Sequence, residues 1–149
     1  MYTSQVEVHV FATVPGGGAT SFNCAVPIQA IGQLHAITVT QESGTLAGFD
    51  VEVFDDARAA PPNTPAALSP APAALTWDAD HHRVCPKFTA ANTAAVAQVF
   101  EPSAWVYRNT DVTVGNRVDA DYLYFKITPA TALTGKSFAI SVRAAQPGA

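Results

Sequence analysis

The sequence holds one cluster of residues with metal-binding chemistry, in the stretch WDADHHRVC at 77–85. Carboxylates, imidazoles and thiolates are the side chains that bind transition metals in proteins. The five candidates are Asp78, Asp80, His81, His82 and Cys85. The adjacent histidines would point to opposite faces of a strand, and neither has the i, i+4 spacing that a helix uses. We therefore favour a solvated turn, with a metal-binding loop as the alternative.

A second acidic pair, Asp119 and Asp121, has the Asp-x-Asp spacing of calcium-binding loops. The glycine and the final glutamate of an EF-hand loop are missing, so a polar turn before a strand explains the pair. The sequence also lacks an H-x-H pair, a nucleophile elbow, a phosphate loop and a dinucleotide fingerprint, and the GGG at 16–18 precedes a strand-like segment. We expect neither an enzyme nor a cofactor.

Aromatic residues offer a different chemistry, because their faces can stack on sugars. The four candidates for glycan binding are Trp105, Tyr107, Tyr122 and Tyr124. Tyr122 and Tyr124 alternate with Leu123 and Phe125, which would place the tyrosine rings on the opposite, more exposed face of a strand. Aromatic pairs on a sheet also serve as cross-strand packing or as interface anchors. Both interpretations stay open.

Period-two alternation of apolar and polar residues predicts most of the elements that position these side chains. In 4–14, one face of a strand holds Val6, Val8, Val10, Ala12 and Val14. In 48–55, the inward residues are Phe49, Val51 and Val53. Further strands are predicted at 20–26, 35–41, 82–88, 103–109, 111–116, 122–128 and 137–144.

One segment, 89–100, has helical character. Thr89 or Asn92 would cap a helix there, and Pro102 would end it. A loop followed by a strand fits the same residues, so the sequence leaves both structures open.

The last two predicted strands, 122–128 and 137–144, are expected to pair as an antiparallel hairpin. That pairing sets Leu123, Phe125 and Ile127 opposite Phe138, Ile140 and Val142. About eight short strands joined by Gly and Pro turns predict an all-β fold, an antiparallel β-sandwich of the jelly-roll kind. The chain has the length of a single domain, 1–149.

A proline-rich tract at 57–77 interrupts this pattern, with five of the eleven prolines and Arg58 as its only charge. Structureless loops of this length are uncommon inside compact domains unless they are functional or disordered. We interpret the tract as an extended arm that docks on a neighbouring subunit, with a loop folded over its own sandwich as the alternative. The predicted partner-binding residues are Pro61, Pro62, Pro65, Leu68, Pro70, Pro72, Leu75 and Trp77.

Charge is scarce. Charged residues make up 13% of the chain, about half of the ~25% that is usual for soluble proteins. A protein packed against neighbours needs less surface charge than a free enzyme, so this favours a structural role in an assembly. The eight scattered Lys and Arg residues and the net charge of −4 argue against nucleic acid as a partner.

The chain has no run of about eighteen apolar residues, which excludes a membrane helix. Its start, MYTSQVEVHV, lacks the basic and apolar regions of a secretion signal, so we expect synthesis in the cytoplasm. In that compartment, Cys24 and Cys85 are expected to be buried thiols, with a disulfide or metal ligation as the alternatives.

Two stretches, ITVTQESGTLAGFDVEVFDDARA at 37–59 and DADYLYFKITPATALTGKSFAISVRA at 119–144, resemble the strand–turn–strand phrases of small tailed-phage virion proteins. These include capsid decoration proteins and short fibre or head-accessory sandwiches. The resemblance implies a non-enzymatic sandwich that is present in many copies on a virion.

From the resemblance, the low charge and the arm together, we expect a capsid decoration protein that stabilises the shell by bridging neighbouring subunits. Its partner would be the major capsid protein or another virion protein, and it would form a homo-oligomer in the assembly. The alternative is a carbohydrate-binding module of a phage fibre.

Overall fold

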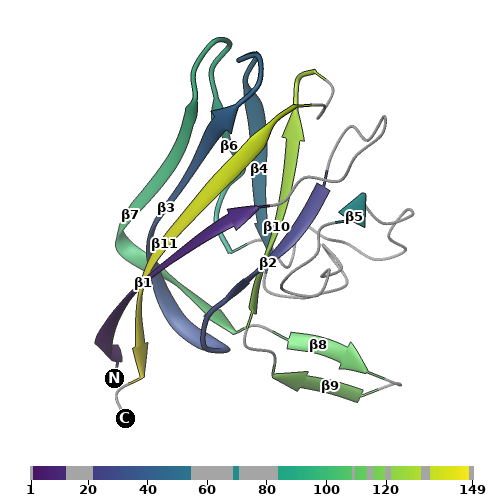
Figure 1. Cartoon of the computed structure of the whole chain (residues 1–149). Coiled ribbons are helices and arrows are strands. Elements are labelled where there is room, and N and C mark those ends of the chain that lie inside the picture. Colours follow the sequence, from purple (N-terminus) through teal and green to yellow (C-terminus); the bar gives the residue numbers. More distant parts are fainter. Residues whose placement is uncertain are drawn as a thin grey trace.

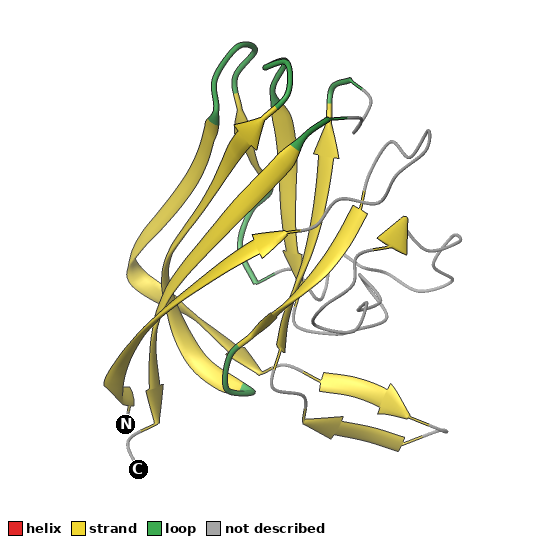
Figure 2. Ribbon diagram, viewed as in Figure 1, coloured by secondary structure: helices red, strands yellow, loops and turns green. Residues whose placement is uncertain are grey.

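The computed structural model describes residues 2–12, 22–54, 69–70, 84–108, 110–113, 116–119, 122–131 and 135–147. Across these ranges the regular structure consists of strands, and helices are absent (Figure 2). The described part accordingly holds no helix long and apolar enough to cross a membrane.

Two antiparallel sheets pack face to face as a sandwich (Figure 1). Sheet A has the order β1-β11-β3-β7 and consists of β1 (Tyr2–Ala12), β3 (Ile31–Ser43), β7 (Val96–Arg108) and β11 (Ser137–Pro147). Sheet B has the order β5-β2-β10-β4-β6 and consists of β2 (Phe22–Pro27), β4 (Phe49–Phe54), β5 (Ser69–Pro70), β6 (Phe88–Ala90) and β10 (Tyr122–Pro129). A separate hairpin pairs β8 (Thr110–Thr113) with β9 (Asn116–Asp119).

The connections between these strands are those of a jelly roll. Without the two-residue β5 and the β8–β9 hairpin, eight strands form two sheets of four. Along the chain they alternate between sheet A and sheet B, apart from β4 and β6, which follow each other in sheet B. Two four-stranded antiparallel sheets joined by repeated crossings define the jelly-roll sandwich. The predicted fold class is confirmed.

The core lies between the two sheets and is built by the alternation that the sequence displays. Phe49, Val51 and Val53 of β4 point inward as predicted, and each is at most 2% exposed. Val8 and Val10 of β1 pack against the same core. One ring contact joins the sheets directly: Phe49 of β4 meets Phe138 of β11 edge to face, with ring centroids 5.1 Å apart.

The predicted hairpin between 122–128 and 137–144 is wrong. β10 pairs with β2 and β4 in sheet B, whereas β11 pairs with β1 and β3 in sheet A. The apolar faces of the two strands therefore meet across the core and not side by side. The inward face of β10 and that of β11 are apolar, and each must be covered by a second layer. In a sandwich the segment between the two strands crosses to the opposite sheet, so that the two apolar faces cover each other.

Segment 89–100 adopts the second of its two predicted structures, a loop followed by a strand. β6 ends at Ala90, a turn closes with a 2.8 Å hydrogen bond from Ala94 N to Ala91 O, and β7 begins at Val96. Pro102 does not end this strand, because β7 is an edge strand of sheet A. Residues 101–104 bulge out opposite the single residue His35, and prolines are tolerated at edges and bulges.

Other predicted strands differ in extent. The one at 103–109 is the second half of β7, and the one at 82–88 begins only at Phe88, after a bend at Val84 and Cys85. The one at 111–116 is part of the β8–β9 hairpin. Position 14, predicted to lie in the first strand, is outside the described residues.

The described residues on either side of the proline-rich tract lie next to each other. Sheet B strand β4 ends at Phe54, and the chain returns at Val84, whose amide donates a 3.0 Å hydrogen bond to the carbonyl of Val53. Within the tract the structure describes only Ser69 and Pro70, which form β5 and pair with Asn23 and Phe22 of the chain's own β2. The other predicted partner-binding residues lie outside the described part: Pro61, Pro62, Pro65, Leu68, Pro72, Leu75 and Trp77.

Candidate interaction surface

The outer face of sheet A, called the A face below, presents three rows of side chains across four strands. Antiparallel pairing aligns the outward residues of β1, β11, β3 and β7, because side chains alternate between the two faces of a strand. The rows are Glu7, Arg143, Ala36 and Phe100, then His9, Ser141, Thr38 and Gln98, then Phe11, Ala139, Thr40 and Val96.

The A face is hollowed along its centre. Apart from Arg143, the outward residues of the two central strands are small, whereas each edge strand carries one phenylalanine, Phe11 or Phe100. One hollow of about 180 Å³ is lined from β1, β11 and β3 by His9, Val10, Phe11, Thr38, Thr40, Ala139, Ile140 and Ser141. A second of about 90 Å³ is lined by Glu7, Ala36, Thr38, Phe100, Ser141 and Arg143. Because both include Thr38 and Ser141, the hollows adjoin and form one trough.

Large apolar side chains are exposed at both edges of this trough. Phe11 on β1 is 80% exposed, and Phe100 and Val96 on β7 are 59% and 41% exposed. Among the described residues only Leu46 joins them as an exposed large hydrophobic side chain, and it lies in the loop after β3. Single exposed apolar residues are ordinary on protein surfaces, whereas a gathering on one face marks an interaction site.

The A face carries its charge in one corner. The Glu7 carboxylate lies 3.3 Å from His9 Nε2, and Glu7 is the cross-strand neighbour of Arg143. The remaining outward residues of the three rows are neutral. Glu7 and Arg143 offset each other in formal charge, so a partner can approach this face without a large electrostatic cost.

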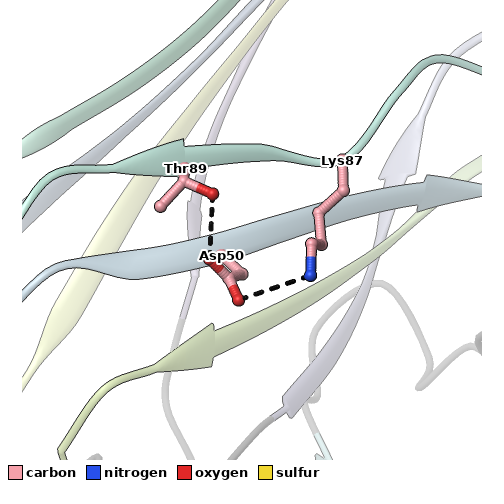
Figure 3. A network of polar contacts seen from close by, with 3 residues as sticks. All are labelled: Asp50, Lys87 and Thr89. Atoms are coloured by element: carbon pink, nitrogen blue, oxygen red, sulfur yellow. Dashed lines mark hydrogen bonds and ion pairs between the residues drawn. The ribbon is translucent and has the colours of Figure 1, made fainter.

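The outer face of sheet B has a different character. Asp50 on β4 accepts a 2.9 Å hydrogen bond from the Thr89 hydroxyl, and its second oxygen lies 3.8 Å from Lys87 Nζ (Figure 3). Glu52 and Lys126 are cross-strand neighbours on the same face. These half-exposed charged groups form the polar surface that is usual for the solvated side of a sheet, where ion pairs contribute little to stability.

The structure separates the four predicted glycan-binding residues. Tyr107 and Tyr124 are each 1% exposed, so their rings have no face available to a sugar. Tyr107 packs against Gly32, where an added Cβ would lie only 2.5 Å from the tyrosine hydroxyl oxygen. Tyr122 is half-buried. Trp105 lies on β7 beside Leu34, and its side chain is outside the described part.

The two cysteines are free and buried, as predicted. Burial raises the pKa of the Cys24 thiol and that of the Cys85 thiol to about 12, because the charged thiolate loses its hydration in the core. Of the predicted metal cluster at 77–85, the structure describes only the last two residues. Within the described ranges no group of three or more His, Cys, Asp or Glu side chains is arranged to hold a metal.

The A face was not predicted from the sequence, although the sequence contains one sign of it. In β1 the polar residues Glu7 and His9 alternate with the partly buried Val8 and Val10, and Phe11 continues the polar side. An aromatic residue at a solvent-facing position is such a signal. Its counterpart Phe100 lies in the segment whose secondary structure was open, so the two could not be placed on one face.

No family model matches the chain, and no curated protein matches it. Sixteen chains of solved structures do. One belongs to the cyanophage Pam1 capsid asymmetric unit: it is 13% identical, with a TM-score of 0.35, over 97% of this chain and 84% of that chain. Another belongs to a full particle of Israeli acute paralysis virus heated to 63 degrees: it is 8% identical, with a TM-score of 0.37, over 97% of this chain and 71% of that chain. Both are chains of viral particles, and a similarity this low does not say what the present chain binds.

Proposed function

We propose that this protein is a structural component of a virion, a capsid decoration protein that binds the shell surface and bridges neighbouring subunits. The observation that carries the proposal is the A face, a neutral trough with exposed phenylalanines along both edges. Such a face favours protein contact over solvent, because full burial of a large apolar side chain contributes about 1.5–3 kcal/mol.

The scarcity of charge supports an assembled state. At 13% charged residues, the chain has little besides neutral polar groups with which to keep an exposed apolar face in solution. In this proposal the tract at 57–77 contacts the shell. Its Pro, Ala and Leu residues suit an apolar groove on the shell.

The experiment is reconstitution on shells from which accessory proteins have been stripped. Purified protein is added in increasing amounts, and the bound fraction is measured by co-sedimentation. The proposal predicts saturable binding at a fixed number of copies per shell. The control variant Leu46→Ala, whose side chain lies in the loop after β3 and outside the A face, should bind in the same way. Binding that does not saturate, or that is absent, would contradict the proposal.

A further inference from the structure

We propose that the A face binds a second copy of this chain about a two-fold axis, with Phe100 of each copy inserted into the larger hollow of the other. The inference rests on the proposed function, in which the A face is buried in an assembly, and it names the partner that covers it. A pair built in this way would present two copies of the tract, one to each of two neighbouring shell subunits.

The larger hollow has the size and lining that an aromatic ring requires. Its volume of about 180 Å³ is close to the ~150 Å³ of an apolar protein cavity that binds benzene. Thr38, Thr40, Ala139 and Ser141 line it with small side chains, which leave room for a ring. The exposed ring of Phe11 borders the same hollow, so an incoming phenylalanine would gain an aromatic neighbour.

The ring and the hollow lie on one face at opposite edges. Phe100 projects from the edge strand β7. The hollow lies over β1, β11 and β3, the other three strands of sheet A, whose arrangement Figure 1 shows. Two copies placed face to face about an axis midway between these points exchange them, so each phenylalanine meets the other copy's hollow. An isologous contact of this kind closes at two copies.

The charge of the A face agrees with a copy of the same face as the occupant, and its area indicates how tightly the two copies bind. The charges on the three rows are Glu7 and Arg143, which offset each other, so two A faces meet without net repulsion. The three rows lie about 6.8 Å apart on four strands that are about 4.8 Å apart, so they cover roughly 400 Å². Standard protein interfaces bury about 800 Å² on each partner, so this contact is of the small, weak class.

The test uses the isolated protein and two complementary substitutions. Phe100→Ala removes the inserted ring, and Ala139→Phe fills the hollow that receives it. Sedimentation equilibrium of the wild type should give twice the monomer mass of 15.6 kDa, and each substitution alone should raise the dimer Kd at least tenfold. Leu46→Ala is the matched control and should leave the Kd unchanged, because Leu46 lies outside the A face.

Mixing the two variants gives the sharper result. In a mixed pair, the intact Phe100 of the Ala139→Phe chain meets the intact hollow of the Phe100→Ala chain. In the other contact, the filled hollow faces the truncated position 100, so no incoming ring clashes with it. Heterodimers should therefore form more tightly than either homodimer. A monomeric wild type at about 1 mM, an unchanged Kd for Phe100→Ala, or no gain on mixing would each overturn the proposal. Saturable shell binding by a monomeric wild type would overturn this inference and leave the proposed function standing.

Discussion

Removal of the Phe138 ring should lower the free energy of unfolding, because this ring connects the two sheets of the sandwich. Phe138 is 1% exposed on β11, and its ring lies edge to face on that of Phe49, with planes at 77° and centroids 5.1 Å apart. A buried Phe→Ala substitution costs about 3–5 kcal/mol. That is a large part of the ~5–15 kcal/mol by which a domain is stable, so leucine is the better replacement for a quantitative series.

The measurement is a double-mutant cycle with Phe49→Leu, Phe138→Leu and the double variant. Urea unfolding gives the free energy of each, at protein concentrations low enough that association adds nothing to stability. The ring pair should appear as a coupling energy of about 0.5–1.5 kcal/mol. Leu46→Ala, in the loop after β3, should change stability by about 0.5 kcal/mol or less.

Additive effects of the two substitutions on the free energy of unfolding would refute the reasoning. Residues that do not touch combine within about 0.3–0.5 kcal/mol, so a coupling energy below that range would mean that the rings are not in contact. It would argue against the arrangement in which β4 and β11 face each other from opposite sheets.

Five other predictions concern the thiols, metals and the tract. Burial raises the pKa of Cys24 and of Cys85 from 9.0 to about 12, so the unfolded chain loses its thiol protons at lower pH than the folded chain. The free energy of unfolding should therefore fall as the pH rises from 9.0 towards 12. Urea unfolding at about pH 8 and pH 10 measures this fall, and Cys24→Ala should make it smaller. Thiol titration should find two free thiols in denaturant and slow reaction in the native state. A chelator should leave the Tm unchanged, and a drop of several degrees would restore the metal hypothesis. Limited proteolysis at 59–76 should be fast in the free protein and slow in protein bound to shells. Attachment to shells should survive about 1 M salt but weaken in the Leu68→Asp, Leu75→Asp double variant. Loss of attachment in high salt, with no effect of the double variant, would show that electrostatic contacts hold the protein without the tract.

The sequence was sufficient to predict which side of several strands is buried, but not of β10, where Tyr124 was expected on the more exposed face and is 1% exposed. In β4 the period-two pattern places Phe49, Val51 and Val53 inward because burial acts on each side chain separately, and no knowledge of the neighbouring strands is needed. Fold class follows from the same information, since many short strands with one apolar face each need a second layer.

Strand pairing could not be predicted in this way. The apolar faces of β10 and β11 have the same pattern whether the strands lie side by side or across the core, and the connections of the whole jelly roll decide between these arrangements. Pro102 was expected to end a helix, because proline cannot continue one. In an edge strand with a bulge, however, proline removes no hydrogen bond that the sheet needs. The A face depends on both features, because only the register across sheet A places Phe11 and Phe100 on one trough.

The most direct test of the central claim is the number of copies of this chain in purified virus particles. Quantitative mass spectrometry of intact particles gives its ratio to the major shell protein. The proposed role as a decoration protein predicts a fixed ratio of this chain to the major shell protein, with the same value in every preparation. Absence of the chain from intact particles, or a ratio that varies with each wash, would contradict a structural role in the virion.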